Sequence, residues 1–321
     1  MGTLRVRLQR ADDRISSRLG RLRAKRPPWE TQPDVLPWPD QPGAEARLAL
    51  TADPEERALL EQWNRDGYIV FDDMVSQHDI DELVAALDRV WDTDRPIKGL
   101  NIDDVRIDPG SPPRLVSHAE LLALGVDERS AARVASRWRI HGFEATEASA
   151  ARIFTNARLR DRASLVLGCR ARPTSSITFR YGSEQTLHQD MAVFHVWPRN
   201  HIVGAWVSCE DVQPGCGPLV FYPGSHREPM FGEFDRYPAT NLHTADEART
   251  ERYQQWINQL AERYERKEFL ARKGQVLLWH SMLFHGGGRV TDPALTRRSF
   301  VVHFSPRGAE LSEIKWEGAR W

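Results

Sequence analysis

Residues 202–226 read IVGAWVSCEDVQPGCGPLVFYPGSH and contain two short apolar runs, 202–208 and 218–222. Pro214-Gly215 separates the runs, and Pro223-Gly224-Ser225 ends the second one. Apolar runs bounded by such turn residues are typical of β-strands. The same pattern predicts further strands over 176–181, 186–190, 269–272, 275–280 and 298–304. Many short strands with turns between them predict a barrel or a jelly roll.

Helical patterns flank this strand-rich part. Leu59, Leu60 and Trp63 predict a helix that ends at Asp66-Gly67, followed by a short buried strand over 68–71. Ser76 and Asp79 resemble a capping box, and an apolar stripe at helical spacing follows them. Helical spacing recurs around 145–168 and 246–266. We therefore predict a mostly β core with flanking α-helices.

Charge and proline divide the chain. The net charge is only -1, but residues 1–26 hold nine Arg and Lys against Asp12 and Asp13, about +7, which leaves about -8 for the remainder. A Pro-rich stretch follows. We predict a basic arm and linker over 1–54, one domain over 55–306 and a tail over 307–321. The arm is either a solvated terminus or a short amphipathic helix (Ile15, Leu19, Leu22) that contacts an anionic membrane surface or a protein partner.

Composition favours a soluble cytoplasmic protein. The chain has three cysteines without a CxxC pair, no apolar run of membrane-spanning length and no apolar signal-peptide core at its start. The near-zero net charge gives no reason to expect nucleic acid as a partner.

His188 and Asp190 are the first candidate metal ligands. Residues i and i+2 of a strand point to the same side, so both can reach one ion while Gln189 faces elsewhere. The third ligand is His280 or His285, which face opposite ways on a continuous strand. We favour His285 because it begins a predicted Gly-Gly-Gly loop where backbone can approach closely, and we interpret His280 as a lining or structural histidine. Two imidazoles and one carboxylate are typical of a non-haem Fe(II) site with open positions.

Arg297 is the candidate anion-binding residue. It shares a strand face with Ser299, Val301 and His303, a mixed polar set that suits a cavity, whereas Arg298 shares the opposite, apolar face. A buried carboxylate needs a charged partner and further donors, which Arg297 and Ser299 can supply. The alternative is that both arginines are surface residues at a strand start.

Several short motifs, in this order, make the chain resemble the phytanoyl-CoA dioxygenase family of Fe(II)- and 2-oxoglutarate-dependent dioxygenases. The likeness runs from about residue 55 to 306 and rests on WNRDGYIV (63–70), GSEQ (182–185), LHQD (187–190), AWV (205–207), GPL (217–219), PGSH (223–226), GQVLLWH (274–280), HGG (285–287) and RRS (297–299).

The resemblance implies a double-stranded β-helix (jelly roll, cupin-like) that holds Fe(II) between His188, Asp190 and His285. It also implies that Arg297, with Ser299, binds the distal carboxylate of 2-oxoglutarate, and that two more residues contact this co-substrate, Gln189 and Trp206. Arg180 and Gln185, which precede the iron ligands in the sequence, are candidates for substrate or co-substrate contact or for a structural role. PGSH is interpreted as a structural turn.

The implied activity is the use of O2 and 2-oxoglutarate to hydroxylate or desaturate a C–H of a small-molecule biosynthetic intermediate, with release of succinate and CO2. The presence of Asp190 argues against a halogenase, which lacks this carboxylate. The substrate could be free, or linked to a carrier, CoA or a lipid. The alternatives are a non-catalytic jelly-roll binding protein and a membrane-associated subunit recruited by residues 1–26.

Overall fold

The computed structural model describes residues 31–108 and 110–311. From Val35 onward the chain forms one compact unit, and residues up to Asp34 form another, of which only 31–34 are described. The predicted helix of the arm lies outside the described residues. The boundaries at residues 54 and 306 stay predictions, although the compact unit extends back to Val35. Among the described residues, no helix has the length and apolar character needed to cross a membrane.

An eight-stranded antiparallel sheet is the centre of the compact unit. Its strand order is β1-β10-β7-β12-β5-β4-β2-β3. The bounds are β1 Tyr68–Phe71, β10 Val276–His280, β7 Val203–Ser208, β12 Ser299–Pro306, β5 Ala171–Phe179, β4 Arg139–His141, β2 Asn101–Val105 and β3 Arg114–Ser117.

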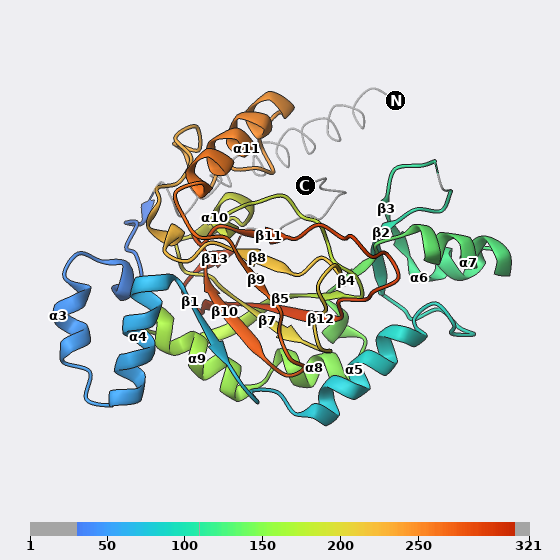
Figure 1. The fold of residues 1–321 in the computed structure, drawn as a ribbon, viewed down its shortest axis with the longest axis horizontal. Coiled ribbons are helices and arrows are strands. Elements are labelled where there is room, and N and C mark those ends of the chain that lie inside the picture. The colour runs from blue at the N-terminus through green and yellow to red at the C-terminus, as the bar shows by residue number, and fades with distance from the viewer. Residues whose placement is uncertain (1–30, 109, 312–321) are drawn as a thin grey trace, which may run out of the picture. The chain divides into compact units, whose positions relative to one another are not determined.

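A smaller sheet, β11-β8-β9, packs over one face of the large sheet (Figure 1). Its strands are β8 Leu219–Phe221, β9 Lys267–Phe269 and β11 His285–Gly287, and a two-stranded sheet pairs β6 Val196–Trp197 with β13 Glu310–Leu311. Apolar side chains from both larger sheets form one buried cluster that includes Trp206, Leu219 and Trp279. This arrangement of two antiparallel sheets confirms the predicted jelly roll.

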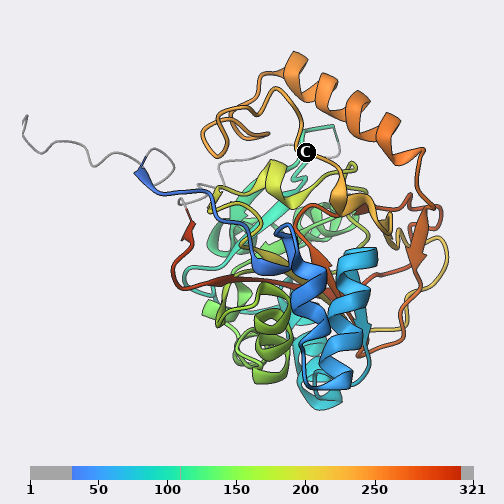
Figure 2. The ribbon, with the colours of Figure 1, turned by 90° about the vertical axis from the view of Figure 1, so that its left-hand side faces the viewer.

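Helices cover the other face of the large sheet and one end of the unit (Figures 1 and 2). On the outer face lie α5 Gln77–Arg89, α8 Ala148–Phe154 and α9 Ala157–Leu167, beside the neighbouring helices α3 Ala44–Ala49 and α4 Pro54–Asp66. α6 His118–Ala123 and α7 Val126–Ala135 follow the β2–β3 hairpin, and α10 Asp190–Val193 and α11 Glu247–Ala261 lie at the opposite side from α9. The described part of the chain also has 3-10 turns, η1 Trp38–Asp40, η2 Phe143–Ala145 and η3 Ser225–Arg227.

Alternation along β12 sorts its side chains between two environments. Phe300, Val302 and Phe304 belong to the apolar core under the helices. The other face carries Val301 and His303, which line a cavity between the sheets. Because side chains alternate along a strand, this face of the large sheet is where the candidate site is built.

Three predicted segments differ from the structure. The strand predicted over 269–272 is displaced toward the N-terminus, because β9 is Lys267–Phe269 and only Phe269 falls within the predicted range. The strand predicted over 186–190 is a loop with a single bridge, from His188 to His285, and α10 begins at Asp190 because the apolar run after it packs as one helical turn into a second core cluster. The glycines after His285 are predicted to form a loop, but Gly286 and Gly287 belong to β11, which pairs with β8. A side chain at Gly287 would lie 2.6 Å from the backbone N of Glu184, so glycine lets the two segments approach.

The Pro-rich stretch is partly folded onto the compact unit. Asp40, in η1, accepts a hydrogen bond from Asn200 at 2.8 Å, and its Oδ2 lies 3.1 Å from Nε2 of His280. The ring of His280 also contacts His226, with 5.2 Å between ring centroids. The PGSH turn is structural, as predicted, because Ser225 Oγ accepts from the backbone N of Phe284 at 2.9 Å and His226 Nε2 donates to the carbonyl of Asn64 at 3.2 Å.

His226 makes stability depend on pH. Burial, and then the electrostatic effect of the neighbouring His280, lowers the pKa of His226 from 6.5 to about 3. Because the folded protein takes up this proton less readily than the unfolded chain, the free energy of unfolding falls as pH drops from about 6.5 toward 3. We expect His226→Gln to remove about 1–2 kcal/mol of the loss between pH 7 and pH 4.5. Urea unfolding at a series of pH values tests this, and equal slopes in both proteins would contradict it.

Candidate metal centre and cavity

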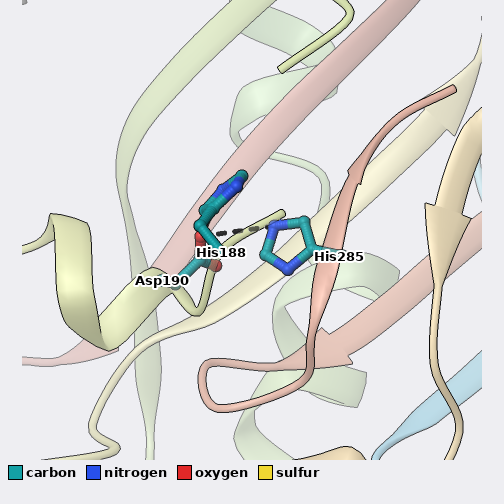
Figure 3. A group of neighbouring side chains, drawn as sticks. All are labelled: His188, Asp190 and His285. Atoms are coloured by element: carbon teal, nitrogen blue, oxygen red, sulfur yellow. Dashed lines mark ion pairs between the residues drawn. The ribbon is translucent and has the colours of Figure 1, made fainter. Parts of the chain in front are cut away.

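His188, Asp190 and His285 meet at one point between the sheets (Figure 3). Their candidate ligand atoms all lie within 4.8 Å of one another. Oδ1 of Asp190 is 3.5 Å from Nε2 of His285 and 3.8 Å from Nε2 of His188. His188 and Asp190 come from the loop before α10 and from its first residue, whereas His285 comes from β11. Two imidazoles and one carboxylate around a single point can hold a divalent metal ion.

Backbone carbonyls orient both imidazoles. Nδ1 of His188 donates to the carbonyl of Thr186 and Nδ1 of His285 to that of Leu283, both at 2.9 Å. These bonds leave the Nε2 lone pairs directed at the common point, as metal-binding histidines require. Burial, and then His285, lowers the pKa of His188 to about 4, so this ring is neutral at pH 7. Burial opposes charge on His285, but the Asp190 carboxylate outweighs it and raises the pKa of His285.

Trp279 and His303 hold the other oxygen of Asp190. The indole Nε1 of Trp279 donates to Oδ2 at 2.8 Å, and Nε2 of His303 lies 3.7 Å from the same atom. Oδ1 of Asp190 therefore faces His188 and His285. Gly204 provides the room for this indole, because a Cβ at that position would lie 2.1 Å from the Trp279 ring.

Replacement of Trp279 by phenylalanine is expected to weaken Co(II) affinity about 10- to 100-fold, the usual effect of losing a partner that orients a metal ligand. The matched control is Trp206→Phe, because no described residue bonds to the buried indole nitrogen of Trp206. Co(II) titration followed by absorbance measures both. If the two variants lose affinity equally, the Trp279–Asp190 bond is not what positions the carboxylate.

His280 lies outside the triad. Its Nε2 faces Asp40 and its Nδ1 accepts from the backbone N of Met282 at 3.0 Å. The structure thus brings His285, and not His280, to the two earlier candidate ligands, in agreement with the interpretation of His280 as structural.

A cavity opens at the triad, whose three residues form part of its lining. Arg297 lies in its wall, only 2% exposed, with its guanidinium carbon 5.4 Å from the centre of the Phe179 ring and 5.8 Å from that of Trp206. The remaining lining residues are Arg139, His141, Ile177, Ser183, Gln185, Thr186, His188, Asp190, Val193, Phe194, Leu219, Leu242, Trp279, His285, Gly286, Val301 and His303.

Arg297 is a buried cation without an acidic partner among the described residues. The one hydrogen bond of its guanidinium to a described residue goes from NH1 to the carbonyl of Gly217 at 3.2 Å, and its Nε has none. Burial lowers the pKa of Arg297 to about 10, which still leaves it charged at pH 7. A buried cation is expected to have an anionic partner, so this side of the cavity fits a carboxylate.

The other two candidate arginines already have partners. Arg298 pairs with Asp88 at 3.0 Å and with Glu210 at 2.6 Å on the opposite face of the strand. Arg298 lies on the face that was predicted to be apolar, but two acidic residues reach its guanidinium there. Arg180 also pairs with Asp88 and is absent from the cavity lining, which favours its structural reading. Gln185, by contrast, lines the cavity.

Only some of the residues predicted to contact the co-substrate line the cavity. Trp206 lines the cavity, whereas Gln189 and Ser299 do not. Nε2 of Gln189 donates to the carbonyl of Met282 at 3.3 Å, and its backbone N donates to the hydroxyl of Tyr253 on α11 at 3.0 Å. Ser299 is fully buried, and its Oγ bonds to no described residue. The aromatic face of α11 packs as core and supports the ligand loop through Tyr253.

Arg139 and His141, on β4, are cavity residues that the sequence did not reveal. The sequence offered a weak signal, the alternation Arg-Ile-His with a buried Ile140 between them. Because of the prolines before this segment, no strand was predicted over 139–141, and the alternation could not be assigned to one.

Comparison with known proteins gives a family match. The family model for phytanoyl-CoA dioxygenase (PhyH) matches residues 63–299. Peroxisomal phytanoyl-CoA dioxygenase of Bos taurus is 25% identical over 143 residues, which are 41% of this chain and 37% of that protein. The alignment therefore spans little more than a third of the bovine protein. Ectoine dioxygenase of Nocardia farcinica is 25% identical over 259 residues, 76% of each chain.

Solved structures show the same fold. EctD from S. alaskensis, crystallised with 2-oxoglutarate and 5-hydroxyectoine, superposes with a TM-score of 0.52 and 23% identity over 77% of this chain and 74% of its own. The epimerase SnoN from nogalamycin biosynthesis, described as non-haem and α-ketoglutarate-dependent, has a TM-score of 0.54 and 15% identity over 80% and 85% of the two chains. The family model covers more than half of the chain and includes all three metal-ligand candidates and Arg297, so the chain belongs to the phytanoyl-CoA dioxygenase (PhyH) family.

Proposed function

We propose that this protein is an Fe(II)- and 2-oxoglutarate-dependent dioxygenase that hydroxylates or desaturates a C–H of a small-molecule biosynthetic intermediate. The observation that carries the proposal is the buried Arg297, a cation without an acidic partner among the described residues, in the same cavity as the His188–Asp190–His285 triad. A metal ion alone would not need this arginine, whereas 2-oxoglutarate has a distal carboxylate for it.

In this proposal, His188, Asp190 and His285 hold Fe(II), and Arg297 binds the distal carboxylate of 2-oxoglutarate. The role of Ser299 as a further donor stays a prediction, because its buried hydroxyl lies on the same strand face two positions along but does not line the cavity. When bound, Fe(II) and 2-oxoglutarate supply the oxidising chemistry, in which O2 is consumed and succinate and CO2 are released.

The protein's own residues position the reactants and exclude water. Trp279 and the carbonyls of Thr186 and Leu283 keep the ligand atoms directed at one point. On the side of α10, the cavity that contains the triad is lined by three apolar side chains, Val193, Phe194 and Leu242. Leu242 is held there by its backbone N, which donates to the carbonyl of Ala192 at 2.8 Å.

Succinate release from 2-oxoglutarate by the Fe(II)-loaded protein tests the proposal. Separated polar-metabolite and lipid pools are added, and His188→Ala is run beside the wild type. We expect one pool to stimulate release in the wild type alone. If neither pool does so and no complex with Fe(II) and 2-oxoglutarate forms under argon, the protein is a non-catalytic jelly-roll binding protein.

Contact between residues 1–26 and a membrane or protein partner stays a prediction from their charge, as does a cytoplasmic location. Deletion of residues 1–26 tests the first. Unchanged turnover with altered vesicle binding would support an anchoring role for the arm, and unchanged vesicle binding would leave the arm without that role.

A further inference from the structure

Residues 222–266 form an insertion between β8 and β9, and this insertion contains α11 (Figure 1). Most residues of one buried apolar cluster come either from 231–261, within the insertion, or from 191–196, directly after Asp190. The chain that carries His188 and Asp190 therefore continues into a core that the insertion builds. The contacts between these two segments decide how firmly the two ligand candidates are held.

His188 pairs with a neighbouring strand on one edge of the chain only. Its backbone N donates to the carbonyl of His285 at 2.9 Å, and its carbonyl accepts from the backbone N of His285 at 3.0 Å. Backbone groups of successive residues in an extended chain point to opposite edges, so those of Leu187 and Gln189 face away from β11. Among the described residues, no strand pairs with them on that edge. These groups need other partners if they are buried.

Two consecutive side chains of α11 supply these partners. The hydroxyl of Tyr253 accepts from the backbone N of Gln189 at 3.0 Å, and Nε2 of Gln254 donates to the carbonyl of Leu187 at 3.3 Å. Leu187 and Gln189 are the residues on either side of His188, and Gln189 directly precedes Asp190. Side chains of a helix thus take the place of a neighbouring strand at the segment that carries two ligand candidates.

Aromatic packing fixes the position of the Tyr253 hydroxyl. The Tyr253 side chain is fully buried, and its ring stacks on Phe234 with 5.6 Å between centroids and meets the Phe231 ring edge-on at 5.7 Å. Burial raises the pKa of Tyr253, so the phenol is neutral at pH 7. Because the ring cannot turn away without opening this packed cluster, its hydroxyl determines where the N–H of Gln189 lies.

Other bonds from the insertion act further along the chain. The backbone N of Leu242 donates to the carbonyl of Ala192 at 2.8 Å, and the hydroxyl of Tyr237 donates to that of Phe194 at 2.7 Å. These bonds hold α10 and the residue after it. The bonds from Tyr253 and Gln254 differ because they act on the residues that flank His188.

We propose that Tyr253 and Gln254 are positioning residues of the metal centre, which direct His188 and Asp190 at the metal by holding the backbone of Leu187 and Gln189. The inference rests on the proposed function for the presence of a metal ion at the triad. Neither side chain lines the cavity, so both act only through the ligand segment. The insertion is then a part of the metal centre, although it lies outside the two sheets.

Co(II) titration of two variants tests the proposal. Tyr253→Phe removes the acceptor and keeps the ring, and Gln254→Met removes the donor and keeps the length of the side chain. We expect Co(II) affinity to fall at least about tenfold in Tyr253→Phe. We expect a loss of about threefold in Gln254→Met, because Leu187 is only half-buried and water can partly replace the donor.

The chain offers a matched control for each variant. Tyr264→Phe removes a hydroxyl that donates to Glu228 at 2.5 Å, away from the ligand segment. Gln255→Met changes the exposed neighbour of Gln254, which bonds through its side chain to no described residue. Both controls should retain Co(II) affinity within about twofold.

Proton NMR at saturating Co(II) separates positioning from a general loss of stability. The Nδ1 protons of His188 and His285 are each held by a backbone carbonyl, and Co(II) bound at Nε2 shifts both signals away from the rest of the spectrum. In Tyr253→Phe we expect one signal to move and the other to stay, because the pairing of β11 with β8 is unchanged. Both control variants should give the wild-type spectrum.

Several results would overturn the proposal. They are wild-type affinity in Tyr253→Phe, an equal loss in Tyr264→Phe, or wild-type signal positions in Tyr253→Phe at saturating Co(II). If Tyr253→Phe does not fold, the milder change decides, and identical affinity and spectra in Gln254→Met and Gln255→Met would overturn it. Failure of the wild type to bind Co(II) is a separate outcome that contradicts the proposed function itself.

Discussion

Replacement of His285 by alanine is expected to weaken Fe(II) and Co(II) affinity by more than about 100-fold and to abolish succinate release. The change removes one of three ligands and leaves the buried Oδ1 of Asp190 facing His188 alone, 3.8 Å away. Metal titration under argon measures the affinity directly and does not depend on knowing the substrate.

His280→Gln is the matched control, because His280 is also buried and lies five residues before His285. It faces Asp40 and not the triad. We expect it to retain metal affinity within about threefold and to lower the free energy of unfolding by about 1–3 kcal/mol, since a buried acid loses its partner. Loss of metal binding in His280→Gln, with normal binding in His285→Ala, would reverse the ligand assignment.

Arg297→Met is expected to raise the dissociation constant for 2-oxoglutarate at least about 30-fold, because losing one partner of a buried charge pair costs about 2–5 kcal/mol. The same change should leave the free energy of unfolding without ligand unchanged or raise it, because it removes a buried cation that has no acidic partner among the described residues. Titration of 2-oxoglutarate into the Fe(II)-loaded protein under argon, together with urea unfolding, measures both effects.

The neighbouring residue supplies the control. Arg298→Met removes the arginine that pairs with Glu210 and one of the two that pair with Asp88, so it should destabilise the fold and leave 2-oxoglutarate affinity within about twofold. We thus expect Arg297→Met to lose 2-oxoglutarate affinity but not stability, and Arg298→Met to lose stability but not affinity. General damage to the fold would not produce this pair of results. Equal loss of affinity in both variants would contradict the assignment of Arg297.

Local patterns predicted much of the fold because they depend on near neighbours. Helices α4 and α5 and strand β10 follow from apolar spacing, caps and turn residues. Local patterns were least reliable where a short apolar run admits two conformations. Residues 190–193 form a helical turn and not a strand end, because burial of the run in a cluster with α11 decides the outcome.

The sequence by itself determined the family, the two candidate ligands two residues apart, and the choice of Arg297 over Arg298. Alternation along β12, which this last choice used, is a property of any strand and needs no knowledge of the neighbours. A different argument, the glycines that follow it, favoured His285 over His280, and the structure brings His285 to the triad.

Only the tertiary structure decided which residues surround those groups. The indole of Trp279 reaches Asp190 because it lies over Gly204, and Arg139 reaches the cavity because β4 pairs with β5. Asp40 reaches His280 across 240 positions of the chain. Such contacts depend on how segments far apart in sequence come together. For Trp279 and Arg139, a register shift of one residue would turn the side chain to the other face of the sheet.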